Sequence, residues 1–241
     1  MKTPTEGGIR ETIPRKYQER FAEWKKEFLE TDLGKEQWER YTKNKNFILT
    51  IKVSAEKNQG ARTDEYLWDE KGNFVGATIT LGNNLEKGFP EATYYPVMSS
   101  LSLRGINHSI DQKILAATKI AHELGHVNQT FNETKEEFVL RHKLGTEYIK
   151  IFLSNGHNPR DRHLLDLAER MGGTPVKIWE SREYWSEVNA LLFLNEKISN
   201  ENFYCRVFNQ INRNIEDLAK NYEDRFERAI NSNSIGAICK K

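Results

Sequence analysis

The stretch that decides this fold reads KIAHELGHV at residues 119–127, where His122, Glu123 and His126 form the pattern H-E-x-x-H. Residues four apart on a helix lie on one face, so both imidazoles can approach one metal ion while Glu123 stands beside them. Zinc suits this geometry best, with a third protein ligand and a water completing its tetrahedron. An open fourth position is typical of a catalytic site, because structural zinc sites use four protein ligands.

The helix that carries this pattern is expected to begin near Ser109, which would be its N-cap, with Asp111 in its first turn. An amphipathic helix whose histidines fall four apart by coincidence would show the same spacing, so the spacing alone leaves both interpretations open. His122 and His126 share one face, and the neighbouring core face is expected to consist of Ile114, Ala117, Ala121 and Leu124.

The composition is that of a soluble globular protein whose helices are heavily charged. The chain has 241 residues, of which 37% are hydrophobic and 29% charged, and this length is enough to bury a sizeable core. A net charge of +1, with basic and acidic residues interleaved, provides no field that would attract nucleic acid or an anionic membrane. No apolar run approaches the length of a membrane span.

The cellular compartment is left open by the sequence. Residues 1–15 have neither the apolar region nor the cleavage site of a signal peptide, so the protein is expected to be cytosolic or exported with its leader removed. Cys205 and Cys239 could form one disulfide, which would suit an exported protein, or remain two separate thiols.

Residues 15–43 are expected to form an N-terminal helical segment made of two amphipathic pieces. The second piece begins after the interruption at residues 31–34 and would point Trp38 and Tyr41 inward. The first piece, at residues 15–30, has a charged face opposite large apolar residues at helical spacing, namely Tyr17, Phe21, Trp24 and Phe28.

Residues 47–82 are expected to form a small antiparallel sheet of about three strands. Residues 47–53 alternate between apolar and polar side chains and are rich in β-branched residues, which predicts a strand. Residues 62–68 and 74–81 flank the turn signal Glu70-Lys-Gly-Asn73, which predicts a hairpin. The last of these strands is the one that precedes the H-E-x-x-H helix in the chain.

The remainder, residues 109–230, is expected to be a helical body. Helices are predicted at residues 133–153, from Asn158 to Gly172, at 178–198 and at about 206–230. Residues 1–241 show no convincing domain boundary, so we expect one α+β domain in which a small sheet packs on a predominantly helical body.

The H-E-x-x-H helix resembles the active-site helix of the zinc metallopeptidases called zincins. The metzincin branch requires a glycine and a histidine downstream, where this chain has Gln129 and Asn132, so that branch is excluded. Peptide deformylases place a cysteine ligand upstream of the pattern, whereas both cysteines here lie downstream. The gluzincin branch takes its third ligand from a glutamate on a later helix, within E-x-x-A/S-D or a near variant.

Glu187 is the residue that best matches this third ligand. The match covers Glu187 and Ala190 and fails at Leu191, where many gluzincins carry an aspartate that supports the metal shell. Glu183, one turn earlier, is the rival ligand. An alternative is that Glu187 is a buried glutamate that faces an arginine, such as Arg182 or Arg206.

The resemblance implies the chemistry of a zinc-dependent metallopeptidase acting on a peptide or protein substrate. His122, His126 and Glu187 would bind Zn²⁺, and Glu123 would act as general base toward the attacking water. Tyr184 and His163 are candidates for stabilising the oxyanion.

The resemblance also implies a substrate-binding strand next to the H-E-x-x-H helix. In zincins the free edge of an antiparallel strand pairs with extended substrate backbone, and residues 74–81 would supply that edge, centred on Gly76, Ala77 and Thr78.

Three other functions fit the same residues. The chain could be a catalytically inactive zinc-bound scaffold that serves as a binding module, although an intact Glu123 has no use in a purely structural site. It could be a helical interaction protein without a metal. A zinc amidase with a non-peptide substrate is the third, because zinc chemistry on a carbonyl does not identify the acyl donor.

Overall fold

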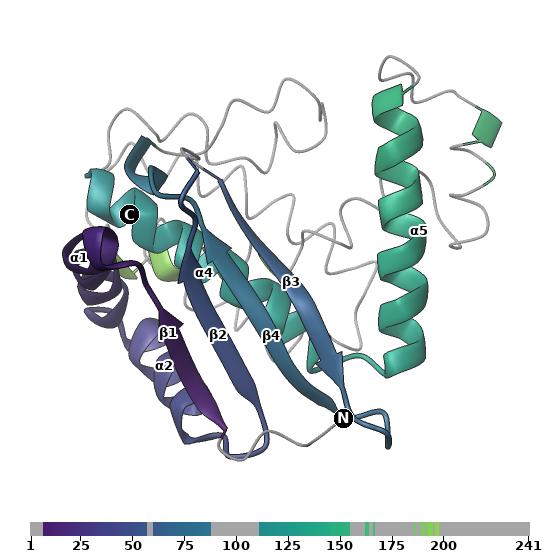
Figure 1. Cartoon of the computed structure of the whole chain (residues 1–241), viewed down its shortest axis with the longest axis horizontal. Coiled ribbons are helices and arrows are strands. Elements are labelled where there is room, and N and C mark those ends of the chain that lie inside the picture. Colours follow the sequence, from purple (N-terminus) through teal and green to yellow (C-terminus); the bar gives the residue numbers. More distant parts are fainter. Residues whose placement is uncertain are drawn as a thin grey trace, which may run out of the picture.

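The structure is a computed structural model that describes residues 7–56, 60–87 and 111–154, and beyond them residues 162, 163, 166, 186, 189, 190, 192–194, 196 and 197. Figure 1 shows the arrangement of its elements. In chain order these are β1 (Gly8–Thr12), the 3-10 helix η1 (Arg15–Tyr17), α1 (Gln18–Leu29), α2 (Asp32–Lys43), β2 (Ile48–Val53), β3 (Ala61–Trp68), β4 (Phe74–Leu81), the 3-10 helix η2 (Leu85–Lys87), α4 (Gln112–Thr130) and α5 (Lys135–Ser154).

The sheet of the described residues has four strands in the order β1-β2-β4-β3 (Figure 1). β1 pairs with β2, and β2 with β4, in parallel, while β3 pairs with β4 antiparallel. The expectation of an antiparallel sheet of about three strands is therefore wrong in strand number and in two of the three pairings. β1 escaped notice because its five residues, GIRET, contain one large apolar side chain and no alternation.

The predicted hairpin is confirmed as β3 and β4. Asp69 organises its turn, because its Oδ1 accepts hydrogen bonds from the backbone N–H groups of Lys71 and Asn73 at 2.9 and 2.8 Å. The Asn73 side chain, which donates to Oδ2, and after it these backbone bonds hold the pKa of Asp69 below its ordinary value. Gly72 has φ +80°, a conformation that glycine adopts without strain.

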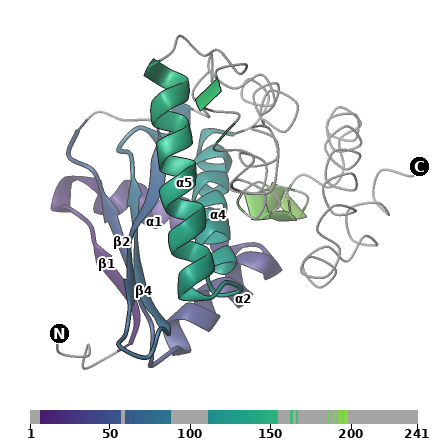
Figure 2. The ribbon, with the colours of Figure 1, turned by 90° about the vertical axis from the view of Figure 1, so that its right-hand side faces the viewer.

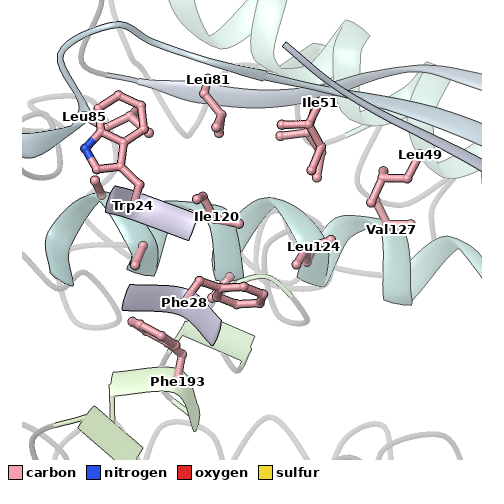
Figure 3. Packing of buried hydrophobic residues seen from close by; sticks show 14 of the residues in the cluster. Trp24, Phe28, Leu49, Ile51, Leu81, Leu85, Ile120, Leu124, Val127 and Phe193 are labelled. Atoms are coloured by element: carbon pink, nitrogen blue, oxygen red, sulfur yellow. The ribbon is translucent and has the colours of Figure 1, made fainter. Parts of the chain in front are cut away.

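Helices α1, α2 and α4 cover one face of the sheet, as Figure 2 shows from the side. The inward faces predicted for α1 and α2 are confirmed, since Phe21, Trp24, Phe28 and Tyr41 are buried and Trp38 packs partly buried against the core. In Figure 3, α4 runs between the strands and the ring pair of Phe28 and Phe193. α4 is thus enclosed on two sides, which explains why its sequence is apolar almost all round.

Helix α4 begins two residues later than the sequence suggested, since its N-cap is residue 111 and not residue 109. Asp111 is its N-cap, because its Oδ1 accepts from the backbone N–H of Lys113 at 2.8 Å. Asp111 therefore does not lie in the first turn as expected, and Ser109 lies outside the described residues. The predicted core face is confirmed, with Ala117, Ala121 and Leu124 fully buried and Ile114 packed against the core but only partly buried.

Helix α5 confirms the helix predicted for residues 133–153. It starts at a capping box in which the Thr134 hydroxyl accepts from the N–H of Glu137 and the Glu137 carboxylate accepts from the N–H of Thr134. The described residues between 186 and 197 are helical, in agreement with the helix predicted for 178–198. None of the helices among the described residues is long and apolar enough to cross a membrane.

Candidate metal centre

His122 and His126 lie one turn apart on α4 and face the same side of the helix. Their ring centroids are 5.2 Å apart and their ring planes are inclined by 83°. Both side chains are partly exposed, although the helix around them is largely buried. The two imidazoles are therefore adjacent to each other at a partly open face of a largely buried helix.

This pair fits two of the three protein ligands that an open zinc site requires. Imidazole nitrogen is a preferred zinc ligand, and side chains four apart on a helix can reach one ion. Within the described residues no group of three His, Cys, Asp or Glu side chains comes together that could hold a metal. Glu187 and Glu183, the third ligands expected from the sequence, both lie outside the described residues.

Glu123 lies between the two histidines in the sequence. Its side chain is buried, and the residue is 4% exposed. The hydroxyl of Thr63 on β3 lies 2.7 Å from its Oε2 and 3.0 Å from its backbone carbonyl oxygen, and it can donate to either. The carboxylate is thus directed toward β3. Sequence reasoning missed Thr63, because only the tertiary fold brings it next to a residue 60 positions further along the chain.

The expectation that Gly76, Ala77 and Thr78 form a free strand edge for substrate is wrong. These residues belong to β4, which pairs with β2 on one side and with β3 on the other, so β4 has no free edge along them. Among the described strands the edge next to α4 is β3, which contacts that helix. The hairpin was predicted correctly, but the parallel pairing of β4 with β2 turned the expected edge strand into an inner one.

Strand β3 contains a bulge that begins after Asp64, the residue that follows Thr63. Its register with β4 shifts between Asp64 and Leu67, and Glu65 has φ +52°, a left-handed conformation that is uncommon outside glycine. Beyond the bulge Tyr66 packs against the core, whereas an unbroken alternation would have pointed it to the opposite face. The bulge therefore lets one strand make two contacts. Thr63 contacts α4, and Tyr66 contacts Phe138 of α5, with the centroids of the two rings 4.7 Å apart.

Lys119 lies one turn before Glu123 on α4 and is 3% exposed. Its Nζ donates to the backbone carbonyl of Leu85 at 3.3 Å. Burial lowers the pKa of this ammonium from 10.5 to about 7, against the opposing effect of the negative charge on Glu123. In the sequence Lys119 stands out as a lysine between the apolar segments Ile114–Ala117 and Ile120–Ala121.

Stability should rise with pH because of Lys119. Between about pH 7 and pH 10 the unfolded chain keeps the proton and the folded chain does not, so the unfolding free energy grows by up to about 1.4 kcal/mol per pH unit. The same free energy is lost when the pH is lowered from about 10 to about 7. Lys119→Met removes the titrating group and should flatten this dependence relative to the wild type. Urea unfolding of both proteins at pH 7.5, 8.5 and 9.5 measures the difference, and parallel curves would contradict the expectation.

Asn189 attaches its segment of the chain to the H-E-x-x-H helix. Its Nδ2 donates to the backbone carbonyl of Ala121, the residue before His122, at 2.6 Å. The side chains of Asn189 and Gln37 on α2 also exchange two hydrogen bonds, of 2.6 and 3.0 Å. Both amides are buried, so their bonds fix α2, α4 and the Asn189 segment together in a place that water does not reach.

The remaining candidates for the site are not brought to it by any described contact. His163 is an exposed residue in a helical conformation, and Tyr184 lies outside the described residues, as do Cys205 and Cys239. The roles suggested for these residues stay predictions.

No protein-family model, curated protein or solved structure matches this chain. A function for the protein therefore has to rest on the chemistry of the side chains gathered around α4.

Proposed function

We propose that this protein is a zinc-dependent hydrolase that cleaves peptide bonds, with His122 and His126 as zinc ligands and Glu123 as general base. One observation carries the proposal. Two imidazoles stand 5.2 Å apart on one face of α4, and the residue between them in the pattern is a buried carboxylate. Metal-assisted hydrolysis needs two such ligands on one face and an acid or base within reach of the attacking water.

The burial of Glu123 supports a role for it beyond packing. A buried carboxylate costs free energy unless hydrogen bonds or charges compensate for its loss of water. Here Thr63 donates to it, and the buried Lys119 lies one turn away on the same helix. An amphipathic helix with two coincidental histidines would have no need of a carboxylate at this position.

We propose Glu187 as the third ligand and Glu183 as its rival. Support comes from Asn189, which donates to the carbonyl of Ala121 directly before His122. Glu187 lies two residues before Asn189, and two residues span at most about 7 Å along a chain, so the backbone at Glu187 is close to that of a residue which contacts the H-E-x-x-H helix. The absence of an aspartate at Leu191 is the main departure from the gluzincin pattern.

The residues divide the proposed reaction between them. A zinc ion held by His122, His126 and Glu187 would polarise the scissile carbonyl and lower the pKa of water toward neutrality. Glu123 would take the proton of the attacking water and pass it to the leaving amine. Tyr184 and His163 remain the candidates for stabilising the oxyanion.

The proposed substrate is an extended peptide or protein segment that pairs with the outer edge of β3. This strand takes the role that the sequence had assigned to β4, because it is the described edge strand that contacts α4. Unpaired backbone groups along a sheet edge are a ready template for an added strand.

Metal analysis tests the site. The purified protein, after zinc supplementation and removal of excess, should hold about one zinc per chain, as expected for a single mononuclear site. His122→Ala and His126→Ala should each abolish stoichiometric binding, and Glu187→Ala should weaken it sharply. His142→Ala is the matched control, because this exposed histidine lies on α5 away from the pattern.

The outcomes separate the alternatives. A wild-type protein without stoichiometric zinc would contradict the proposal, and loss of zinc in Glu183→Ala but not in Glu187→Ala would exchange the third ligand. Cleavage of a broad peptide library supports the peptidase. Zinc binding without cleavage would instead favour the binding module or an amidase with a non-peptide substrate.

A further inference from the structure

The contact between Thr63 and Glu123 joins the edge strand to the proposed general base. Thr63 Oγ1 lies 2.7 Å from Glu123 Oε2 and 3.0 Å from the backbone oxygen of the same residue. A hydroxyl has one proton to donate and two lone pairs that accept, so it can serve these two acceptors only in turn. Both distances fall within the range of good hydrogen bonds.

This arrangement satisfies the carboxyl group before and after it receives a proton. When Glu123 is ionised, the hydroxyl donates to Oε2. When Glu123 holds the proton taken from the attacking water, the hydroxyl can turn its own proton to the backbone oxygen and accept from the carboxyl group. Thr63 keeps its proton throughout, and the proton taken up by Glu123 leaves with the amine.

The position of the Thr63 side chain is fixed by the sheet. Thr63 stands opposite Ile79 of β4 in the sheet, and Ile79 is fully buried on the face that the helices cover. Threonine is also stiff at χ1, because two heavy atoms on Cβ restrict its rotamers. Asp64 also pairs with β4, at Thr78, and the register shifts only after it, so the strand is paired with β4 on both sides of the residue that contacts Glu123.

We infer that Thr63 is a positioning residue that holds the Glu123 carboxylate in place for the hydrolysis of a peptide lying along β3. This inference rests on the proposed function. Thr63 acts through Glu123 and is not itself given a contact with the substrate. Its hydroxyl would fix the distance between the base and the strand edge on which the substrate extends.

Steady-state kinetics of Thr63→Val and Thr63→Ser test the role. Valine keeps the shape and removes the hydroxyl, so kcat should fall about tenfold to a hundredfold while KM stays within about twofold, as expected when an interaction with a charged group is lost and substrate binding is not. Serine restores the hydroxyl and should return kcat to within about threefold of the wild type.

Thr80→Val is the matched control. Thr80 is a buried threonine of β4 that stands opposite Arg62 on the other face of the sheet, so removing its hydroxyl should leave kcat unchanged. A Thr63→Val enzyme with wild-type kcat, or a Thr63→Ser enzyme as slow as Thr63→Val, would overturn the inference. An equal loss in Thr80→Val would overturn it as well, because the effect would then be general to the sheet.

A second measurement needs no turnover. In metal-free protein, the unfolding equilibrium constants of the wild type, Thr63→Val, Glu123→Met and the double variant form a thermodynamic cycle. The two substitutions should be coupled by about tenfold or more, as expected for a hydrogen bond to a charged group. Additive effects would show that the contact contributes nothing. If the two substitutions are coupled but the wild-type protein cleaves no peptide, the contact is real. Both the catalytic role of Thr63 and the proposed function are then overturned.

Discussion

Glu123→Gln is expected to lower kcat/KM for peptide cleavage by about 10²–10⁴-fold while zinc stays bound. Glutamine has nearly the shape of glutamate, and its side-chain oxygen can still accept from the Thr63 hydroxyl that lies 2.7 Å from Glu123 Oε2. It cannot take a proton from water, however. The loss should therefore appear in turnover and not in metal content or folding.

Initial rates on a cleaved library peptide, together with zinc content, measure this effect. Glu136→Gln is the control, because it removes an exposed carboxylate on α5 and should leave the rate unchanged. A Glu123→Gln enzyme within about tenfold of the wild type would mean that another group is the base, since general base catalysis contributes at least a hundredfold. Loss of zinc in this variant would instead give Glu123 a structural role.

Phe28→Ala is expected to reduce the unfolding free energy by about 3–5 kcal/mol. The Phe28 side chain is fully buried, and its ring stacks on that of Phe193 with centroids 5.7 Å apart and meets the edge of Trp38 at 6.3 Å. Alanine would leave a cavity among the buried apolar side chains of the core. Since small domains are stable by only about 5–15 kcal/mol, this one substitution removes a large share of the total.

Urea unfolding monitored by tryptophan fluorescence and by circular dichroism measures the change. Leu140→Ala is the control, because Leu140 is 56% exposed on α5 and its truncation should cost less than about 0.5 kcal/mol. A Phe28→Ala protein within about 1 kcal/mol of the wild type would contradict the tight packing of α1 against α4 and Phe193.

The elements that the sequence predicted well are those defined by local patterns. Helical spacing of aromatic residues identified α1 and α2, and the turn at residues 69–73 identified the β3–β4 hairpin almost to the residue. Local patterns fail where the signal is short or non-local. β1 has too few apolar residues to alternate, and the pairing of β4 with β2 joins segments that are not consecutive strands.

By itself, the sequence determined that His122, Glu123 and His126 share one turn of a buried helix, because the spacing of residues on a helix is fixed by backbone geometry. Only the tertiary structure decided what surrounds that turn. Thr63 reaches Glu123 from β3, Asn189 reaches Ala121 from far downstream, and β3 replaces β4 as the edge. The physical reason is that burial and strand order depend on which distant surfaces exclude water together, and no local spacing encodes that choice.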